Sequence, residues 1–223
     1  MKKIIIPGWS TGDSSWGVTK PYLDFFSNYG QVDIITPRKG IVEADLLVIP
    51  GGMDLNPNKY GEVPGFFTGN IDVYKNYFYE QNLPQYIKAG IPIFGICLGF
   101  QSICSYFGSK LTQHMYHPYS SSRSELVHKI YPVLGYDNVN GYKTKRGKED
   151  KYFKVNSLHH QAVSQYNLGS DLKPLYLDED GFFVEVVKHA KLPIAGVQYH
   201  PEELGYDKIT DVIIKEFLKI EDE

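Results

Sequence analysis

IPIFGICLGFQ, residues 91–101, is the stretch that decides how the rest of the chain is interpreted. Its first half is apolar and predicts a buried strand, and the residues after Gln101 favour a helix. Cys97 lies at the turn between the two, with Gly95 and Gly99 on either side. A nucleophile at such a strained turn needs glycine neighbours, and the free N–H groups that begin the helix favour a thiolate. The stretch alone is equally typical of a nucleophile and of a buried core cysteine.

Strand-like and helix-like segments alternate along the first half of the chain. The predicted strands cover residues 3–6, 32–36, 45–49 and 91–96, and the predicted helices cover residues 18–29 and 71–89. Pro84 is expected to kink or break the second helix. Apolar strands that alternate with helices form a mostly parallel sheet covered on both faces, so the sequence predicts an α/β fold.

The second half of the chain ends with two strands and a helix. Residues 182–187 and 194–199 predict strands, and residues 208–220 predict an amphipathic helix. Residues 108–150 mix polar, aromatic and basic side chains, which predicts a small antiparallel excursion from the parallel sheet. No linker rich in proline, glycine and serine interrupts the chain, so we expect a single domain over residues 1–223.

Composition excludes several classes of protein. With 42% hydrophobic residues and a net charge of −3, the chain is typical of a globular protein, and its acidic balance argues against nucleic acid as a partner. No apolar run reaches membrane-spanning length and the first residues do not resemble a signal peptide, so we expect no membrane association. Cys97 and Cys104 are poorly spaced for a disulfide, which favours a cytoplasmic location, and Cys104 is most simply a packed helix residue.

Three segments bring reactive groups to the carboxyl ends of predicted strands, where the sites of parallel α/β sheets form. Gly51 and Gly52 follow one strand, Cys97 follows another, and His200 closes the last. A nucleophilic cysteine needs a base and a third group that orients the base, and His200 with Glu202 supplies both. A His-Pro-Glu sequence alone is more often a surface turn, but its combination with the glycine-flanked cysteine reverses that balance.

Other histidines offer a second interpretation. His114, His117 and His128 have a spacing that zinc ligands adopt, but no cluster of cysteines or carboxylates accompanies them, so we predict no metal. His159 is equally well explained as a buried structural histidine, and the basic residues 143–148 as a solvated surface.

Residues 95–101 (GICLGFQ), 196–202 (GVQYHPE) and 50–52 (PGG) together resemble the class I glutamine amidotransferase superfamily, in the same order and over nearly the whole chain. The resemblance implies a flavodoxin-like fold and no cofactor. It further implies a triad of Cys97, His200 and Glu202, an oxyanion hole from the backbone N–H groups of Gly52 and Leu98, and Gln101 beside a bound γ-glutamyl group.

Two further stretches resemble the γ-glutamyl hydrolase branch, which includes γ-glutamyl-γ-aminobutyrate hydrolases: residues 50–62 (PGGMDLNPNKYGE) and 155–161 (VNSLHHQ). This branch implies hydrolysis of a small γ-glutamyl amide through a thioester, with release of glutamate and an amine. It makes candidate substrate contacts of Asp54, Tyr60 and His160, each of which a structural role explains equally well. Leu98 departs from the branch, which often has arginine after the nucleophile, and matches the amidotransferase form.

The leaving group is the open part of this interpretation. Residues 116–123, which end at Arg123, combine aromatic rings, hydroxyls and a guanidinium, and the basic loop adds Lys143, Lys145 and Arg146. The chain resembles hydrolases of bacterial surface-polysaccharide (capsule) pathways, which implies a γ-glutamyl conjugate bearing a nucleotide diphosphate such as cytidine diphosphate. A surface loop explains residues 116–123 equally well.

Two other functions stay open. A glutaminase subunit that delivers ammonia to a partner synthetase is an alternative that the absence of a synthetase domain permits but does not support. A non-catalytic binding protein is disfavoured by the complete set of Cys97, His200 and Glu202.

Overall fold

A nine-stranded sheet organises the computed structural model, which describes residues 1–11, 15–36, 40–116, 118–133 and 152–220. Five adjacent strands run parallel, in the spatial order β4 (Gln31–Ile35), β1 (Lys3–Pro7), β5 (Leu46–Ile49), β6 (Ile93–Ile96) and β13 (Ile194–Val197). Four antiparallel strands extend the sheet beyond β13, in the order β12 (Val184–His189), β11 (Leu172–Asp178), β8 (His128–Pro132) and β9 (Phe153–Val155). The predicted α/β sheet with an antiparallel excursion is confirmed.

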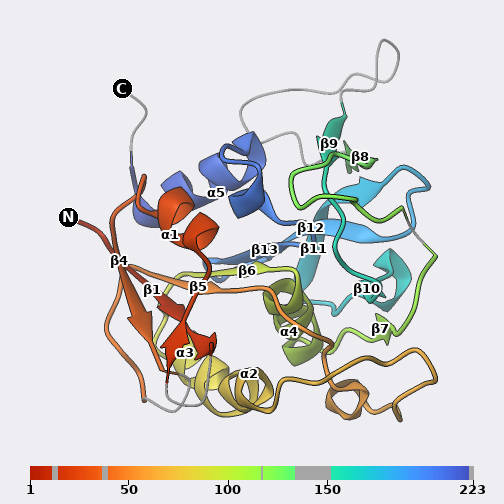
Figure 1. Ribbon diagram of the computed structural model, residues 1–223, viewed down its shortest axis with the longest axis horizontal. Helices are drawn as coiled ribbons and strands as arrows, with labels where there is room; N and C mark the ends of the chain where they lie inside the picture. Colours follow the sequence, from red (N-terminus) through yellow and green to blue (C-terminus); the bar gives the residue numbers. More distant parts are fainter. Residues whose placement is uncertain (12–14, 37–39, 117, 134–151, 221–223) are drawn as a thin grey trace.

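Helices cover both faces of the parallel strands (Figure 1). One face carries α1 (Lys20–Phe26) and α5 (Lys208–Leu218), and the other carries α2 (Val73–Tyr77), α3 (Leu83–Lys88) and α4 (Leu98–Tyr106). Side chains of β1 alternate between the two layers, because Ile4 packs with Phe26 of α1 whereas Ile5 packs with Tyr86 of α3. All four of these side chains are fully buried.

The predicted break in the helix over residues 71–89 lies next to Pro84. A π-helical turn, Phe78–Asn82, separates α2 from α3, which has Pro84 in its first turn. Proline has no N–H to donate to the carbonyl four residues earlier, and this interrupts the regular hydrogen-bond pattern.

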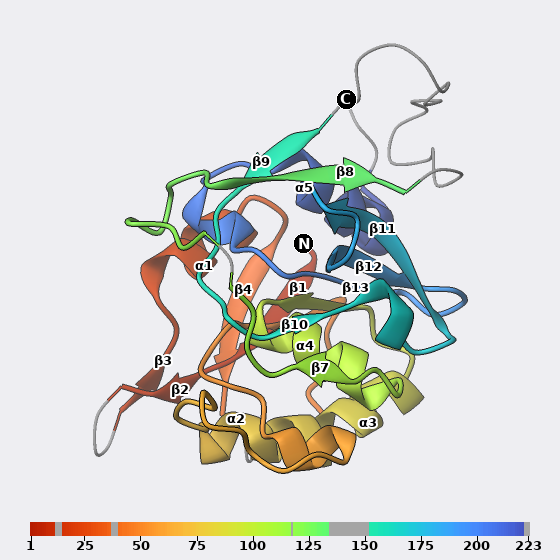
Figure 2. The ribbon, with the colours of Figure 1, turned by 90° about the vertical axis from the view of Figure 1, so that its right-hand side faces the viewer.

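Two pairs of short strands lie outside the nine-stranded sheet. The two-residue strands β2 (Trp9–Ser10) and β3 (Trp16–Gly17) pair as a hairpin before α1, and β7 (Leu111–Thr112) pairs with β10 (Ala162–Val163) beside α4 (Figure 2). Single-turn 3₁₀ helices cover Pro57–Tyr60, Gln165–Asn167 and Pro201–Glu203. His117 and the basic residues Lys143, Lys145 and Arg146 lie outside the described residues. Among the residues that the structure describes, no helix has the length and apolar character needed to span a bilayer.

The topology places the candidate site. Strands β5, β6 and β13 are neighbours and run parallel, so their carboxyl ends meet at one edge of the sheet. Gly51 and Gly52 follow β5, Cys97 follows β6, and His200 lies three residues beyond β13.

Candidate functional site

Cys97 occupies a sharp turn between β6 and α4. Its φ of 50° and ψ of −106° are unfavourable for a residue with a side chain, and a conformation of this kind recurs at functional turns. The N–H of Cys97 donates to the carbonyl of Val197 in β13, at 2.9 Å, which ties the turn to the strand that leads to His200.

The two glycines that flank Cys97 are needed for close packing. A Cβ atom at Gly99 would lie 2.2 Å from the carbonyl oxygen of Ile49, and one at Gly95 would lie 2.6 Å from the carbonyl carbon of Gly99. The first turn of α4 therefore packs directly on β5, with its N–H groups at the end of the cysteine strand.

His200 and Glu202 form a buried ion pair beside Cys97. The 3₁₀ turn Pro201–Glu203 brings the Glu202 carboxylate back to the ring, and His200 Nδ1 lies 2.7 Å from Glu202 Oε1. With Nδ1 donating to the carboxylate, Nε2 is the ring nitrogen left to exchange a proton with Cys97.

The charge state of His200 follows from its neighbours. Burial lowers the pKa of His200, but the negative charges of Glu202 and Cys97 outweigh that effect and raise the pKa to about 10. The imidazolium form is therefore favoured at neutral pH, where it can pair with a Cys97 thiolate.

Asn156 fixes the backbone of His200. Its side-chain amide accepts the His200 N–H at 2.8 Å and donates to the His200 carbonyl at 2.9 Å. The same amide nitrogen donates to the carbonyl of Arg123, at 2.7 Å. Asn156 is fully buried, so these bonds hold the base in place without competition from water.

The glycine loop after β5 lies against this group. A Cβ atom at Gly51 would be 2.6 Å from His200 Cε1 and 3.4 Å from Cys97 Cβ. One at Gly52 would be 2.8 Å from Leu98 Cδ2, so the two residues of the predicted oxyanion hole are neighbours. Leu98 begins α4 and its N–H has no acceptor within the helix, as an oxyanion donor requires.

Asp54 and His160, two of the candidate substrate contacts, contact each other. His160 Nε2 lies 2.9 Å from Asp54 Oδ1, and Asp54 Oδ2 accepts the N–H of Gly69 at 2.6 Å. His160 Nδ1 lies 3.2 Å from Nδ1 of His114, whose ring stacks on Phe67 with 4.2 Å between centroids. Both carboxylate oxygens of Asp54 are therefore engaged in holding neighbouring segments.

The remaining candidate substrate contacts differ in how many hydrogen bonds or ion pairs their side chains already form. Gln101 is buried and donates to the Gln161 carbonyl at 2.9 Å and to Gln198 Oε1 at 3.2 Å. The hydroxyl of Tyr60 is buried without a hydrogen-bond partner among the described residues. Arg123 is paired with Glu203, at 2.9 Å, on the surface beside the His-Pro-Glu turn.

The histidines considered as metal ligands lie in different surroundings. His114 contacts His160, whereas His128 in β8 lies 3.5 Å from Glu185 of β12, with both of these side chains fully buried. His159 is buried, and its Nδ1 lies 3.0 Å from the carbonyl of Gln161. Within the described ranges, no three histidine, cysteine or acidic side chains gather as a metal site would require.

Cys104 is a core residue, as its sequence predicts. It is fully buried in α4, and burial raises the pKa of its thiol. Both cysteines are buried, but they differ in their neighbours. Among the described residues, only Cys97 lies beside a histidine.

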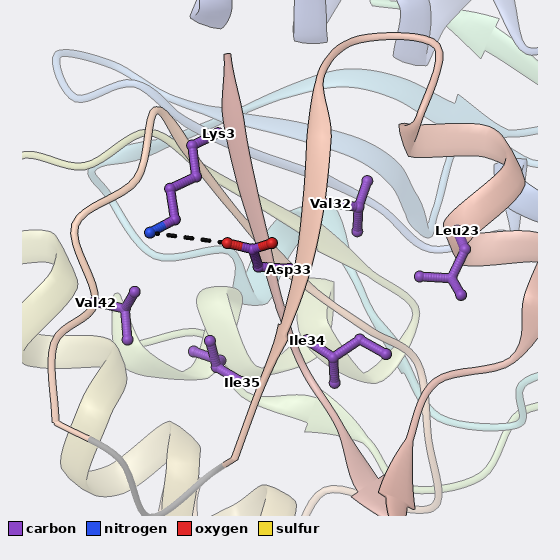
Figure 3. Close-up of a pocket in the computed structure, with 7 residues that line it drawn as sticks. All are labelled: Lys3, Leu23, Val32, Asp33, Ile34, Ile35 and Val42. Carbon is purple, nitrogen blue, oxygen red and sulfur yellow. Dashed lines mark ion pairs between the residues drawn. The ribbon is translucent and has the colours of Figure 1, made fainter. Parts of the chain in front are cut away.

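A separate hollow of about 470 Å³ lies at the β4 edge of the sheet (Figure 3). It is lined by Lys3, Leu23, Val32, Asp33, Ile34, Ile35 and Val42. Its two charged side chains face each other, with 3.8 Å between Lys3 Nζ and Asp33 Oδ2. None of the catalytic candidates lines it.

Four residues at the site were not singled out by the sequence: Tyr22, Lys75 and Tyr79, which carry no motif, and Asn156, which lies in the quoted stretch 155–161 without an assigned role. The two tyrosines have the apolar spacing of core residues, and Lys75 belongs to an aromatic-rich helix. Each acts through a hydrogen bond to backbone distant in sequence, which no local pattern records.

Replacing Glu202 by glutamine is expected to weaken the thiolate–imidazolium pair. The carboxylate charge that raises the pKa of His200 would be lost, so His200 would be neutral at lower pH. We expect iodoacetamide to alkylate Cys97 about tenfold more slowly at pH 7, and the rate to recover only at higher pH. The measurement is the alkylation rate against pH. Glu203→Gln, which removes the neighbouring carboxylate that pairs with Arg123, is the matched control, and identical profiles in the two variants would contradict the assignment.

Comparison with known proteins identifies the family of this chain. The sequence matches the Peptidase C26 family over residues 31–202. YvdE of Lactococcus lactis, a proposed glutamine amidotransferase-like protein, is 28% identical over 192 residues, which cover 81% of this chain and 78% of that protein. One subunit of the glutamine-hydrolysing GMP synthase of Pyrococcus abyssi is 28% identical over 181 residues, covering 78% of this chain and 84% of that subunit.

A solved structure shows the same fold. A Thermoplasma acidophilum protein, proposed to be a GMP synthase subunit, aligns with a TM-score of 0.66 at 20% identity, covering 98% of this chain and 94% of that one. The superfamily that the motifs predict is confirmed: this chain belongs to the Peptidase C26 family of class I glutamine amidotransferase-like proteins.

Proposed function

We propose that this chain hydrolyses γ-glutamyl amides through a thioester on Cys97. Its family supports a hydrolase, and the glutamine-hydrolysing relative supports an amide as the bond that is cleaved. The observation that carries the proposal is the His200–Glu202 pair, 2.7 Å apart and buried, beside a cysteine held at positive φ. A structural cysteine would need neither an oriented imidazolium nor a strained turn.

In the first half of the reaction, the Cys97 thiolate attacks the γ-carbonyl carbon. The oxyanion that forms would accept hydrogen bonds from the N–H groups of Gly52 and Leu98. His200 gives its Nε2 proton to the departing nitrogen, the C–N bond breaks, and a neutral amine leaves the γ-glutamyl thioester behind.

In the second half, water replaces the amine. Neutral His200 takes a proton from the water as its oxygen attacks the thioester, and the same two N–H groups hold the second oxyanion. Collapse breaks the C–S bond and releases glutamate and the thiolate. Glu202 keeps Nδ1 of His200 protonated throughout, which leaves Nε2 as the nitrogen that exchanges protons.

A simple amine is the leaving group that we favour. The guanidinium of Arg123 is paired with Glu203, and Ser120 Oγ donates to the Glu125 carbonyl and accepts the Ser157 N–H. These contacts engage Ser120 and one guanidinium nitrogen of Arg123 in holding the loop, so the polysaccharide (capsule) substrate is the weaker form of the proposal. The proposed substrate contacts are Gln101, Asp54, Tyr60 and His160, with Arg123 added for a nucleotide conjugate.

A glutaminase subunit is the second candidate, and the similarity to the Pyrococcus abyssi GMP synthase subunit favours it. Such a protein would use the same thioester chemistry on glutamine and pass ammonia to a synthetase. Leu98, which matches the amidotransferase form of the nucleophile motif, is compatible with either function.

We also infer that residues 1–223 act as one catalytic domain in a reducing compartment such as the cytoplasm. Both cysteines are free and buried, and the strands of the candidate site belong to one continuous sheet.

The test is glutamate release by the purified chain from glutamine, from γ-glutamyl amines and from a γ-glutamyl nucleotide conjugate. We expect turnover of a γ-glutamyl amine with kcat on the order of 1 s⁻¹ or more without a partner. If glutamine is turned over only when a synthetase is added, the chain is a glutaminase subunit and the hydrolase proposal is wrong. If only the nucleotide conjugate is hydrolysed, the substrate of the polysaccharide pathway is favoured over a simple γ-glutamyl amine.

A further inference from the structure

Three side chains hold the backbone of the glycine loop, residues 50–52. The hydroxyl of Tyr79 donates to the carbonyl of Pro50 at 3.4 Å, and the N–H of Gly51 donates to the hydroxyl of Tyr22 at 2.8 Å. Lys75 Nζ donates to the carbonyl of Gly51 at 2.5 Å. The loop is thus fixed by groups that none of the triad roles requires.

Lys75 is unusual among these groups because it is a buried cation. The residue is 8% exposed, and no carboxylate of the described residues pairs with its ammonium within 4.0 Å. The ammonium lies instead over the ring of Trp9, 4.3 Å from the centroid, and against the Gly51 carbonyl. Keeping a charge in such a place is costly unless it compensates negative charge nearby.

The electrostatics of Lys75 agree with its position. Burial lowers its pKa to about 8, while the negative charges of Asp72, at the start of α2, and of Cys97 act in the opposite direction. Asp72 is the larger of these two influences, and Cys97 is close enough to contribute.

The geometry of the peptide bond connects Lys75 to the oxyanion hole. In a trans peptide the C=O and N–H point in opposite directions, and the carbonyl of Gly51 shares its peptide plane with the N–H of Gly52. We propose that Lys75 is a positioning residue of the oxyanion hole, because by holding the Gly51 carbonyl it keeps the Gly52 N–H turned away from itself and toward the acyl group on Cys97.

Two consequences of this contact support the role. The ammonium polarises the peptide group, so the Gly52 N–H becomes a stronger donor to an oxyanion. The contact also leaves little room beside residue 52, since a Cβ atom there would lie 2.6 Å from Lys75 Nζ and 2.8 Å from Leu98 Cδ2. The inference rests on the proposed function, because it assigns Gly52 to an oxyanion hole.

The test compares Lys75→Met, which removes the charge and the donor, with Lys75→Arg, which keeps both. Without Lys75 the Gly52 N–H is free to rotate, so we expect kcat of Lys75→Met to fall about 10²-fold with KM nearly unchanged. Alkylation of Cys97 by iodoacetamide, which forms no oxyanion, should fall by less than about tenfold. We expect Lys75→Arg to recover most of kcat. Lys88→Met, at an exposed position at the end of α3, is the matched control and should behave as wild type.

The outcomes separate this inference from the proposed function. An inactive wild-type chain would remove the proposed function whatever the variants do. An active wild type with an unchanged kcat in Lys75→Met would overturn only the role of Lys75, as would an equal loss of kcat and of alkylation. If Lys75→Met does not fold, Lys75→Leu, which also lacks the charge and the donor, replaces it, and a kcat equal to that of Lys75→Arg would overturn the role.

Discussion

Replacing Cys97 by alanine is expected to abolish glutamate release, with kcat lower by about 10⁴-fold or more. No other group in the described site can form the thioester, and the oxyanion donors and His200 alone leave only a small residual rate. The substitution removes one sulfur atom from a turn that Gly95 and Gly99 define, so the fold should be retained. The measurements are glutamate release at saturating substrate and the intact mass of the protein, which in wild type should show a transient γ-glutamyl adduct.

Cys104→Ala is the matched control for this prediction. Cys104 is the other free cysteine, fully buried within the same helix, and burial raises the pKa of its thiol. We expect Cys104→Ala to keep wild-type kcat while the free energy of unfolding falls by about 1 kcal/mol, because a buried sulfur is lost. Residual activity in Cys97→Ala at more than about a hundredth of the wild-type rate would exclude the thioester mechanism.

The parallel half of the sheet could be predicted because its signals are local. Strands β1, β5 and β6 are short apolar runs buried on both faces, and each ends at a glycine-containing turn. The catalytic candidates also have local signals, since Glu202 is two residues from His200 and both glycines lie two residues from Cys97. These residues follow parallel strands that are neighbours in the sheet, and the carboxyl ends of such strands meet at one edge.

The residues that complete the site could not be predicted, because their contacts connect distant parts of the chain. Asn156 bonds to the backbone of His200 across 44 residues, and Lys75 bonds to Gly51 across 24. An asparagine after a strand and a lysine in a helix are both ordinary in sequence. Only the fold shows that one fixes the base and that the other is a buried cation.

The hairpin of β2 and β3 was missed for a different reason. Its strands are two residues long, and the segment between Gly8 and Gly17 is rich in serine, glycine and aspartate, which predicts a loop. The hairpin is nevertheless part of the site's wall, because Trp9 lies under the ammonium of Lys75 and packs edge-to-face on Tyr22, 6.0 Å between centroids.

Replacing Gly99 by alanine adds one methyl group, and of all such additions at this site we expect it to lower the free energy of unfolding most. The added Cβ would lie 2.2 Å from the carbonyl oxygen of Ile49 and 3.0 Å from its Cβ, and both belong to the central strand β5. Neither atom can move without displacing the sheet, so α4 must shift. We expect the free energy of unfolding to fall by about 3 kcal/mol, measured by urea denaturation.

Activity should fall in the same variant even where it remains folded. Cys97 and the Leu98 N–H both sit on the first turn of α4, so a shift of that turn away from β5 separates them from the Gly52 N–H. We expect kcat to fall at least about tenfold at a temperature well below the unfolding midpoint. Gly40→Ala is the control, since Gly40 is exposed and a Cβ atom there would meet nothing within 4 Å, so its stability should change by less than about 0.5 kcal/mol. Wild-type stability and rate in Gly99→Ala would mean that α4 does not pack on β5 as closely as the oxyanion hole requires.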